Sequence, residues 1–157
     1  MHSVIIQVGV EPIPKENYIN EGSYYEHWFT REIADYVDEL LDGDRLKVIK
    51  KMDRFDGIQV SRDEGGEFIV LTDKEKFFAR PYERFKNSLK TLGTIQLSDF
   101  ATDGASIGCW MHLLNEAYND KRDVYIVTSD DTFTISEFVR LHKCGKYYIG
   151  GVLNYHA

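Results

Sequence analysis

The spacing of hydrophobic and polar positions divides the chain into predicted strands and helices. Short runs rich in β-branched and aromatic residues, some of them alternating with polar ones, predict strands. These runs are residues 2–10, 55–61, 67–71, 123–128, 132–135 and 146–155. Segments whose apolar residues recur three and four positions apart predict helices. They are residues 23–41, 44–52, 72–92, 103–119 and 136–143.

Glycines mark two special backbone positions in this pattern. Gly65 and Gly66 separate two predicted strands and supply the positive φ of a tight reversal, which predicts a β-hairpin. Gly150 and Gly151 lie inside the last predicted strand, where paired glycines indicate a β-bulge or a close backbone approach. Residues 94–102 fit either a strand or a loop, and the pattern does not separate the two.

Two of the predicted helices carry further signals. Pro81 lies inside the segment 72–92, where a proline must kink the helix or begin a second one. In the segment 103–119, apolar residues gather on one face, which we interpret as the side that meets the core. This face comprises Ile107, Trp110, Met111, Leu114, Ala117 and Tyr118.

The order of these elements predicts the fold class. Hairpins interrupt the alternation of strand and helix, which favours an α+β fold with a mostly antiparallel sheet of about five to six strands and helices packed on one side. The chain has 157 residues and neither an internal repeat nor a low-complexity linker. We therefore expect a single domain spanning residues 1–157.

Composition and charge narrow the functional classes. The chain is 43% hydrophobic and 29% charged, with 26 acidic and 19 basic residues and a net charge of −7. This negative charge disfavours direct binding to nucleic acid or to an anionic membrane. Fourteen of the acidic residues lie in the segment 11–64, against eight basic ones. The acidic character is therefore concentrated in the first part of the chain.

The cellular context follows from what the sequence lacks. The first ten residues show neither the basic region nor the cleavage site of a signal peptide, and no apolar run is long enough to span a membrane. The chain has two cysteines, too few for a disulfide framework. On these grounds we expect a cytoplasmic protein. We also expect no cofactor, because the usual phosphate-binding, dinucleotide-binding and nucleophile-elbow motifs are missing.

The predicted helix 23–41 supplies the main functional hypothesis. Its polar side combines two aromatic residues with a row of carboxylates whose mutual repulsion calls for a compensating partner. These residues are Tyr24, Trp28, Glu32, Asp35, Glu39 and Asp42. One interpretation is a solvated face, with Trp28 under a neighbouring element or the acids paired with the basic segment 74–90. The other is a docking surface for a basic protein partner.

The function that we expect on this basis is non-enzymatic protein binding. A compact acidic chain of this size fits an inhibitor, an immunity-type protein or a mobile-element accessory protein, and the sequence does not separate these roles. Nucleic-acid mimicry by the carboxylate row is a minor variant, because the charge density is far below that of a duplex.

A thiol-dependent hydrolase or transferase is the alternative. Cys109 and His112 lie three residues apart on a predicted helix, and an imidazole can activate a thiol as a nucleophile. The string from Gly108 to Trp110 resembles the nucleophile segment of papain-like cysteine proteases, which implies a catalytic role for Cys109. The glutamine that precedes this segment in that family is missing, since Asp103 stands six residues before Cys109.

Other histidines and a second cysteine bear on the same alternative. His142 or His156 is a further candidate base if the fold brings it close to Cys109. As an ordinary residue, Cys109 would be a small packed hydrophobe. Together with Cys144 these residues lack the spacing of a structural zinc site, so we expect no metal.

Overall fold

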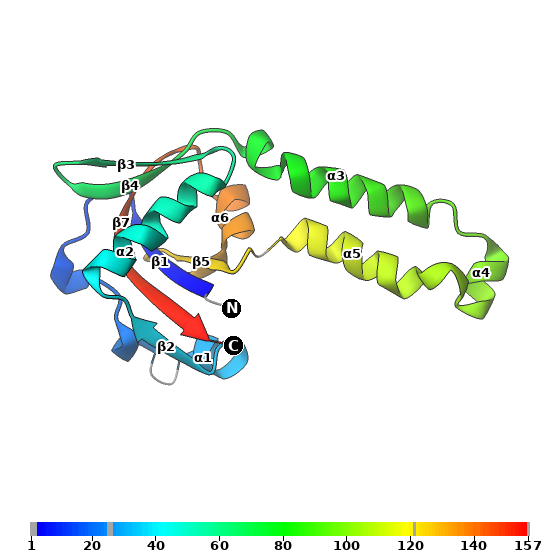
Figure 1. Ribbon diagram of the computed structural model, residues 1–157, viewed down its shortest axis with the longest axis horizontal. Helices are drawn as coiled ribbons and strands as arrows, with labels where there is room; N and C mark the ends of the chain where they lie inside the picture. Colours follow the sequence, from blue (N-terminus) through cyan, green and yellow to red (C-terminus); the bar gives the residue numbers. More distant parts are fainter. Residues whose placement is uncertain (1–2, 25–26, 121, 157) are drawn as a thin grey trace.

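A seven-stranded sheet forms the body of the protein, and two long helices project from it as an arm (Figure 1). The structure, a computed structural model, describes residues 3–24, 27–120 and 122–156. Neighbouring strands follow the order β3, β4, β7, β1, β5, β6, and β2 pairs with β7 beside this path. The strands are β1 (Ser3–Gly9), β2 (Tyr36–Glu39), β3 (Ile58–Asp63), β4 (Gly66–Leu71), β5 (Val124–Val127), β6 (Thr132–Thr134) and β7 (Gly145–His156).

Six α-helices and four short 3₁₀ helices complete the described part of the chain. The α-helices are α1 (Trp28–Glu32), α2 (Asp42–Lys50), α3 (Lys74–Leu92), α4 (Leu97–Thr102), α5 (Ile107–Asn119) and α6 (Ile135–Leu141). The 3₁₀ helices are η1 (Lys15–Asn17), η2 (Glu21–Tyr24), η3 (Lys51–Arg54) and η4 (Gly104–Ser106). Within these ranges, no helix is long and apolar enough to cross a membrane.

The predicted α+β class is confirmed, but the sheet is mixed and larger than expected. β1 and β5 pair in parallel, with Val4 opposite Val124, whereas the other pairings are antiparallel. A parallel pair needs a long crossover connection, and the chain between β1 and β5 supplies one that includes the whole arm. Periodicity within single strands carries no information on such a distant pairing.

Helices cover both faces of the sheet, so the expectation of helices on one side is wrong. Successive side chains of a strand point to opposite faces. Ile6 on β1 belongs to a core that includes side chains of α2, α3 and α6. Its neighbour Ile5 belongs to a second core, which contains Phe29 of α1 and Tyr24 of η2. Each face of β1 therefore has its own helical cover.

The helix predicted for residues 23–41 is wrong. The end of η2, the short helix α1 and the strand β2 lie in this range, of which residues 25 and 26 are outside the described part. The backbone N–H of Asp35 donates to the carbonyl of His156 at 2.6 Å, and β2 continues this pairing along β7. Val37 is buried while its neighbours are exposed, a period of two that fits a strand. Hydrogen bonds to the open edge of β7 thus override the helical spacing.

The two glycines of β7 form the predicted irregularity. The register between β1 and β7 shifts between Ile6 and Val8, opposite Gly150 and Gly151. A Cβ atom on Gly151 would lie 2.5 Å from the carbonyl oxygen of Ile19, closer than real Cβ atoms approach. The prediction of a bulge with a close backbone approach is therefore confirmed.

Candidate protein-binding surface

The arm consists of α3 and α5, which pack against each other in opposite directions and are joined through α4 and η4 (Figure 1). Asp73 caps α3 by accepting a hydrogen bond from the backbone N–H of Lys76 at 3.0 Å. α3 then continues through Pro81, which is buried. Ser88 and Ala117 are buried as well, and such small residues allow two helices to approach closely. These buried residues mark the line along which α3 and α5 contact each other, which we call the inner seam of the arm.

Beside this line of contact, α3 and α5 each carry a row of hydrophobic residues, several of which are exposed. On α3 the spacing of hydrophobic residues alternates between four and three, as in a helix that meets a second helix along a heptad seam. These residues are Phe78, Tyr82, Phe85, Leu89 and Leu92. On α5 the same spacing relates Ile107, Met111, Leu114 and Tyr118. The most exposed members are Tyr82 (56%), Leu89 (53%), Met111 (59%) and Tyr118 (54%).

The two stripes lie on the same side of the arm. The rings of Phe85 on α3 and Tyr118 on α5 are 6.5 Å apart between centroids. The guanidinium of Arg140 lies over Phe78 at 4.7 Å and over Tyr118 at 4.1 Å, so both rings turn toward α6. Together the stripes form one continuous surface, which we call the apolar face of the arm.

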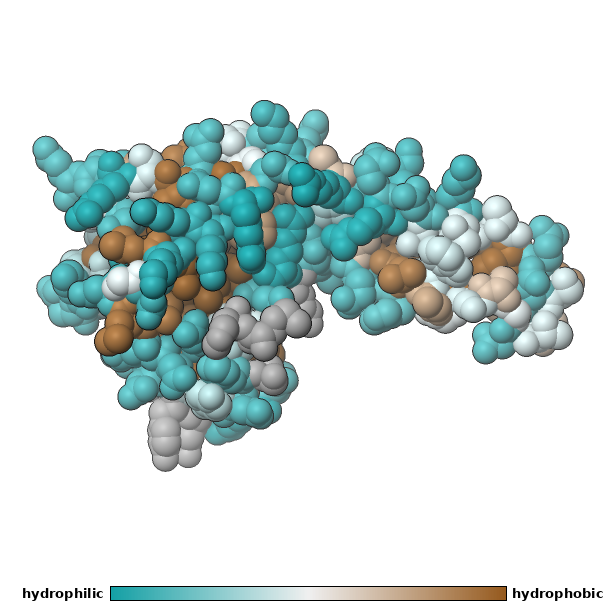
Figure 2. Space-filling model, in the orientation of Figure 1, coloured by the Kyte–Doolittle hydropathy of each residue, from teal (hydrophilic) through white to brown (hydrophobic). Residues whose placement is uncertain are grey.

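The apolar face continues to the far end of the arm. Leu97 and Phe100 of α4 are 83% and 74% exposed, although large hydrophobic side chains are usually covered. A groove of about 840 Å³ runs between them and α5. Figure 2 shows hydrophobic side chains along the arm and at its tip, in contrast to the polar surface above α3. An exposed apolar patch of this kind is typical of interaction sites.

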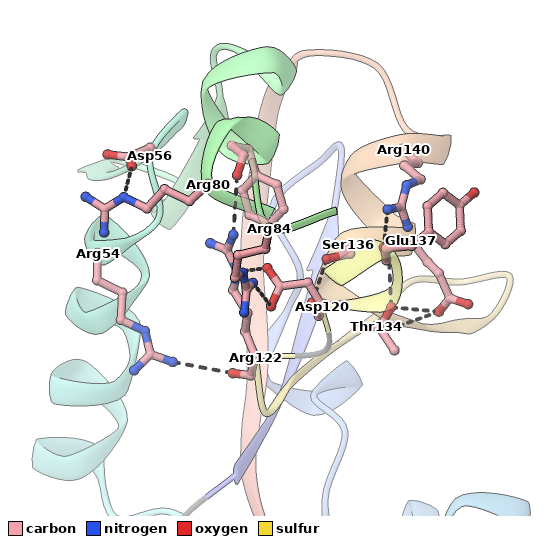
Figure 3. Close-up of polar contacts among 12 residues, drawn as sticks. Arg54, Asp56, Arg80, Arg84, Asp120, Arg122, Thr134, Ser136, Glu137 and Arg140 are labelled. Atoms are coloured by element: carbon pink, nitrogen blue, oxygen red, sulfur yellow. Dashed lines mark hydrogen bonds and ion pairs between the residues drawn. The ribbon is translucent and has the colours of Figure 1, made fainter. Parts of the chain in front are cut away.

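Charged residues hold the base of the arm against the body (Figure 3). Asp120, directly after α5, pairs with Arg84 of α3 at 3.2 Å and with Arg122. The Ser136 hydroxyl of α6 donates to the Asp120 carbonyl at 2.6 Å. The Arg122 guanidinium also lies 4.6 Å from the centre of the Phe77 ring. These contacts join both arm helices to α6 and so position the apolar face relative to the sheet.

The residues of the predicted acidic docking face do not share a helix face. Tyr24 is 4% exposed and packs edge-on against Phe29, and burial raises its pKa to about 12. Trp28 is 40% exposed at the start of α1, which also contains the exposed Glu32. Asp35 lies between α1 and β2, Glu39 ends β2, and Asp42 begins α2, all three exposed. The surface that the sequence proposes is thus distributed over separate elements.

The basic residues of α3 find other partners than this acidic group. Arg80 pairs with Asp56 at 3.6 Å, and Arg84 pairs with Asp120. The ammonium group of Lys74 donates to the carbonyl of Arg140 at 3.0 Å. Within the described residues, the ion pairs of segment 74–90 are therefore made with Asp56 and Asp120 and not with the acidic group that the sequence suggested.

The two cysteines and two of the candidate histidines lie in two places, Cys109 and His112 on α5 and His142 and Cys144 between α6 and β7. Cys109 is exposed on α5 and Cys144 is exposed before β7. Within the described ranges, no hydrogen bond joins the thiol of Cys109 to His112 or His142, and no cluster suited to a metal ion is present. The His142 ring stacks on Phe138 at 4.4 Å.

The third candidate base lies at the end of β7. His156 stacks on Tyr36 at 4.5 Å, and its Nε2 lies 3.7 Å from a carboxylate oxygen of Asp38. His142 and His156 thus contact aromatic or acidic neighbours of the body, whereas His112 lies on α5 in the arm. A catalytic role of Cys109 stays a prediction.

A second polar group lies on the body, around the hairpin of β3 and β4. Lys146 and Tyr148 of β7 contact the carboxylate of Asp63, the tyrosine hydroxyl at 2.9 Å. The hydrogen bond from Lys146 lowers the pKa of Asp63 below its usual range. These contacts connect the hairpin to the central strand, which is a structural role.

Arg45 of α2 makes a similar connection. Its guanidinium donates to the carbonyl of Gly150 at 2.8 Å and to Glu67 at 3.3 Å. Burial acts to raise the pKa of Glu67, but hydrogen bonds and the charges of Arg45 and Arg62 outweigh it, so this pKa is lowered. Arg45 thereby attaches α2 to the bulge of β7.

Sequence reasoning missed the apolar face of the arm, although its signal is present. The predicted core-facing side of residues 103–119 includes Met111 and Tyr118, but both side chains are exposed, as are Tyr82 and Leu89 on α3. The regular spacing of four and three on α3 is the pattern that would have indicated a second seam. No family model, curated protein or solved structure matches this chain.

Proposed function

We propose that this protein is a non-enzymatic binding module that recognises a protein partner through the apolar face of the arm. The observation that carries this proposal is the exposed hydrophobic stripe on both α3 and α5, in which Tyr82 and Leu89 are seven positions apart, as are Met111 and Tyr118. A helix of a partner protein that lies along this stripe contacts one row of hydrophobic residues on α3 and a second row on α5.

Two properties of the arm support binding rather than packing within the body. The apolar face extends onto α4, at the end of the arm that points away from the sheet (Figure 1). The base is held by the Asp120 ion pairs and by Arg140, so the face is presented in a defined orientation. A surface ordered before binding loses less conformational entropy when a partner docks.

The proposal replaces the acidic helix as the docking surface but keeps the expected class of function. Tyrosine is enriched at protein interfaces, and Tyr82 and Tyr118 are the exposed aromatic residues of the stripe. Exposed leucine and methionine side chains flank them. We therefore expect recognition to depend mainly on apolar contacts, with basic side chains of α3 at the rim.

Site-specific photocrosslinking tests this proposal. A benzophenone amino acid replaces Tyr82 on the arm or, as a matched control, Tyr36 on β2, which is 51% exposed. In cells, we expect a discrete crosslinked protein species from position 82 and none from position 36. The variant Leu89→Glu should remove the species, whereas Leu41→Glu at an exposed position outside the arm should not. Equal crosslinking from both positions, or none from position 82, contradicts the proposal.

A further inference from the structure

The apolar face has properties of a surface that binds its own copy. In a pair related by a two-fold axis, the same patch faces itself, so it must be complementary to its own shape. Both helices of the arm carry the spacing of four and three, and each therefore suits a helix with the same spacing. Two such arms side by side make a four-helix bundle, in which each stripe is covered.

The area of the apolar face is in the range that a stable pair needs. A large aromatic side chain buries about 150 to 250 Å², so each half-exposed member offers on the order of 100 Å². Six such members give roughly 600 Å², against about 800 Å² per partner in a standard interface. They are Tyr82, Leu89, Leu97, Phe100, Met111 and Tyr118. The aliphatic stems of the flanking Lys86 and Lys90 add to this area.

Charge along the arm favours one orientation of the pair. α3 carries six basic and two acidic residues. The tip, residues 93–106, carries Asp99 and Asp103 and no basic residue. An antiparallel arrangement places the acidic tip of each arm beside α3 of the other, whose net charge stays positive after Arg80 pairs with Asp56 and Arg84 pairs with Asp120. A parallel arrangement would place tip against tip, where like charges repel.

We infer that the apolar face binds a second copy of this chain, with the two arms antiparallel in a symmetric four-helix bundle. This inference rests on the proposed function, because it names the partner of the same surface. In the bundle, Leu97 and Phe100 of each tip cover the partner's stripe near the base of its α3. The bodies of the two protomers lie at opposite ends of the bundle.

Sedimentation velocity of the full chain tests the self-association. We expect the mass to rise from 18.2 kDa toward twice that value as the concentration is raised through the micromolar range. Leu89→Glu and Met111→Glu should each raise the dissociation constant by at least about tenfold, since a carboxylate would be buried in the bundle. Leu41→Glu is the control, and circular dichroism establishes that each variant is folded.

Distances between two spin labels test the orientation. Ala101→Cys, in a background with both native cysteines replaced by serine, places one label on each tip. The 19 residues of α3 span about 28 Å, so antiparallel tips lie farther apart than about 30 Å and parallel tips within about 20 Å. A short distance contradicts the antiparallel bundle.

The outcomes also separate this inference from the proposed function. A chain that stays monomeric at every concentration overturns the inference. If the benzophenone amino acid at position 82 then still crosslinks to a different protein, the proposed function holds with another partner. A monomer without an arm-specific crosslink overturns both.

Discussion

The guanidinium of Arg140 on α6 lies 4.1 Å from the centre of the Tyr118 ring on α5, and the same group donates to the Tyr118 carbonyl. One side chain thus covers the last turn of the arm and satisfies a carbonyl at its end. Planar guanidinium groups stack on aromatic faces in a way that an ammonium group does not reproduce.

Replacing Arg140 should therefore loosen the arm. For Arg140→Ala we expect a loss of about 1 to 2 kcal/mol in the free energy of unfolding, from the cation–π contact and the hydrogen bond together. Urea denaturation measures this loss, and the exposed Lys143→Ala serves as control. Arg140→Lys should recover only part of the stability. Identical midpoints for Arg140→Ala and the wild type would show that the contact does not stabilise the arm.

Gly151 should tolerate no side chain. A Cβ there would lie 2.5 Å from the Ile19 carbonyl oxygen, so Gly151→Ala must displace backbone, at a cost of about 1 to 3 kcal/mol. Gly43 in α2 has open space around the equivalent position, and there alanine should be neutral or should stabilise by up to about 1 kcal/mol. Thermal unfolding of the two variants measures the difference. A change of the same sign and size in both would contradict the close approach.

Buried tyrosines should make the protein sensitive to alkaline pH. Burial raises the pKa of both Tyr24 and Tyr125 to about 12, above the usual value of 10. Because the folded pKa is the higher one, their stabilising contribution is complete below pH 10 and is lost as the pH rises toward 12. Tyr24→Phe should reduce this alkaline loss, as measured by denaturant unfolding at a series of pH values. An unchanged pH curve would show that ionisation of Tyr24 does not drive it.

The reactivity of the two thiols tests the alternative of a thiol-dependent enzyme. Cys109 and Cys144 are both exposed, so access does not separate them. The protein-binding proposal predicts comparable alkylation of both by iodoacetamide at mildly acidic pH, as measured by peptide mass spectrometry. Much faster alkylation of Cys109 would instead favour the enzyme, because only a thiolate reacts rapidly under these conditions.

Most of the elements could be predicted from local sequence because they depend on local interactions. The hairpin of β3 and β4 follows from alternation around the glycine pair at its turn. The arm helices α3 and α5 follow from their apolar periodicity. The tip helix α4 did not, since residues 94–102 gave neither clear alternation nor a clear helical period.

The candidate site was only partly accessible from the sequence. The apolar residues of α5 were recognised as one face, and Ala117 is indeed buried. Which half of that face meets α3 and which half remains exposed depends on the packing angle of two helices, and a single helix contains no information on that angle. The acidic docking face assumed a continuous helix, which is absent from the described residues 27–41, and partner binding by its residues stays a prediction.

The sequence by itself determined the α+β class, the turns, the bulge of β7 and the acidic character of the first part of the chain. Tertiary structure alone decided that residues 36–39 form a strand, that β1 and β5 pair in parallel, and that the arm leaves a hydrophobic face exposed. The physical reason is the range of the interactions. Helical periodicity and turn chemistry act over a few residues, whereas the open edge of β7 and the angle between α3 and α5 arise only when distant segments meet.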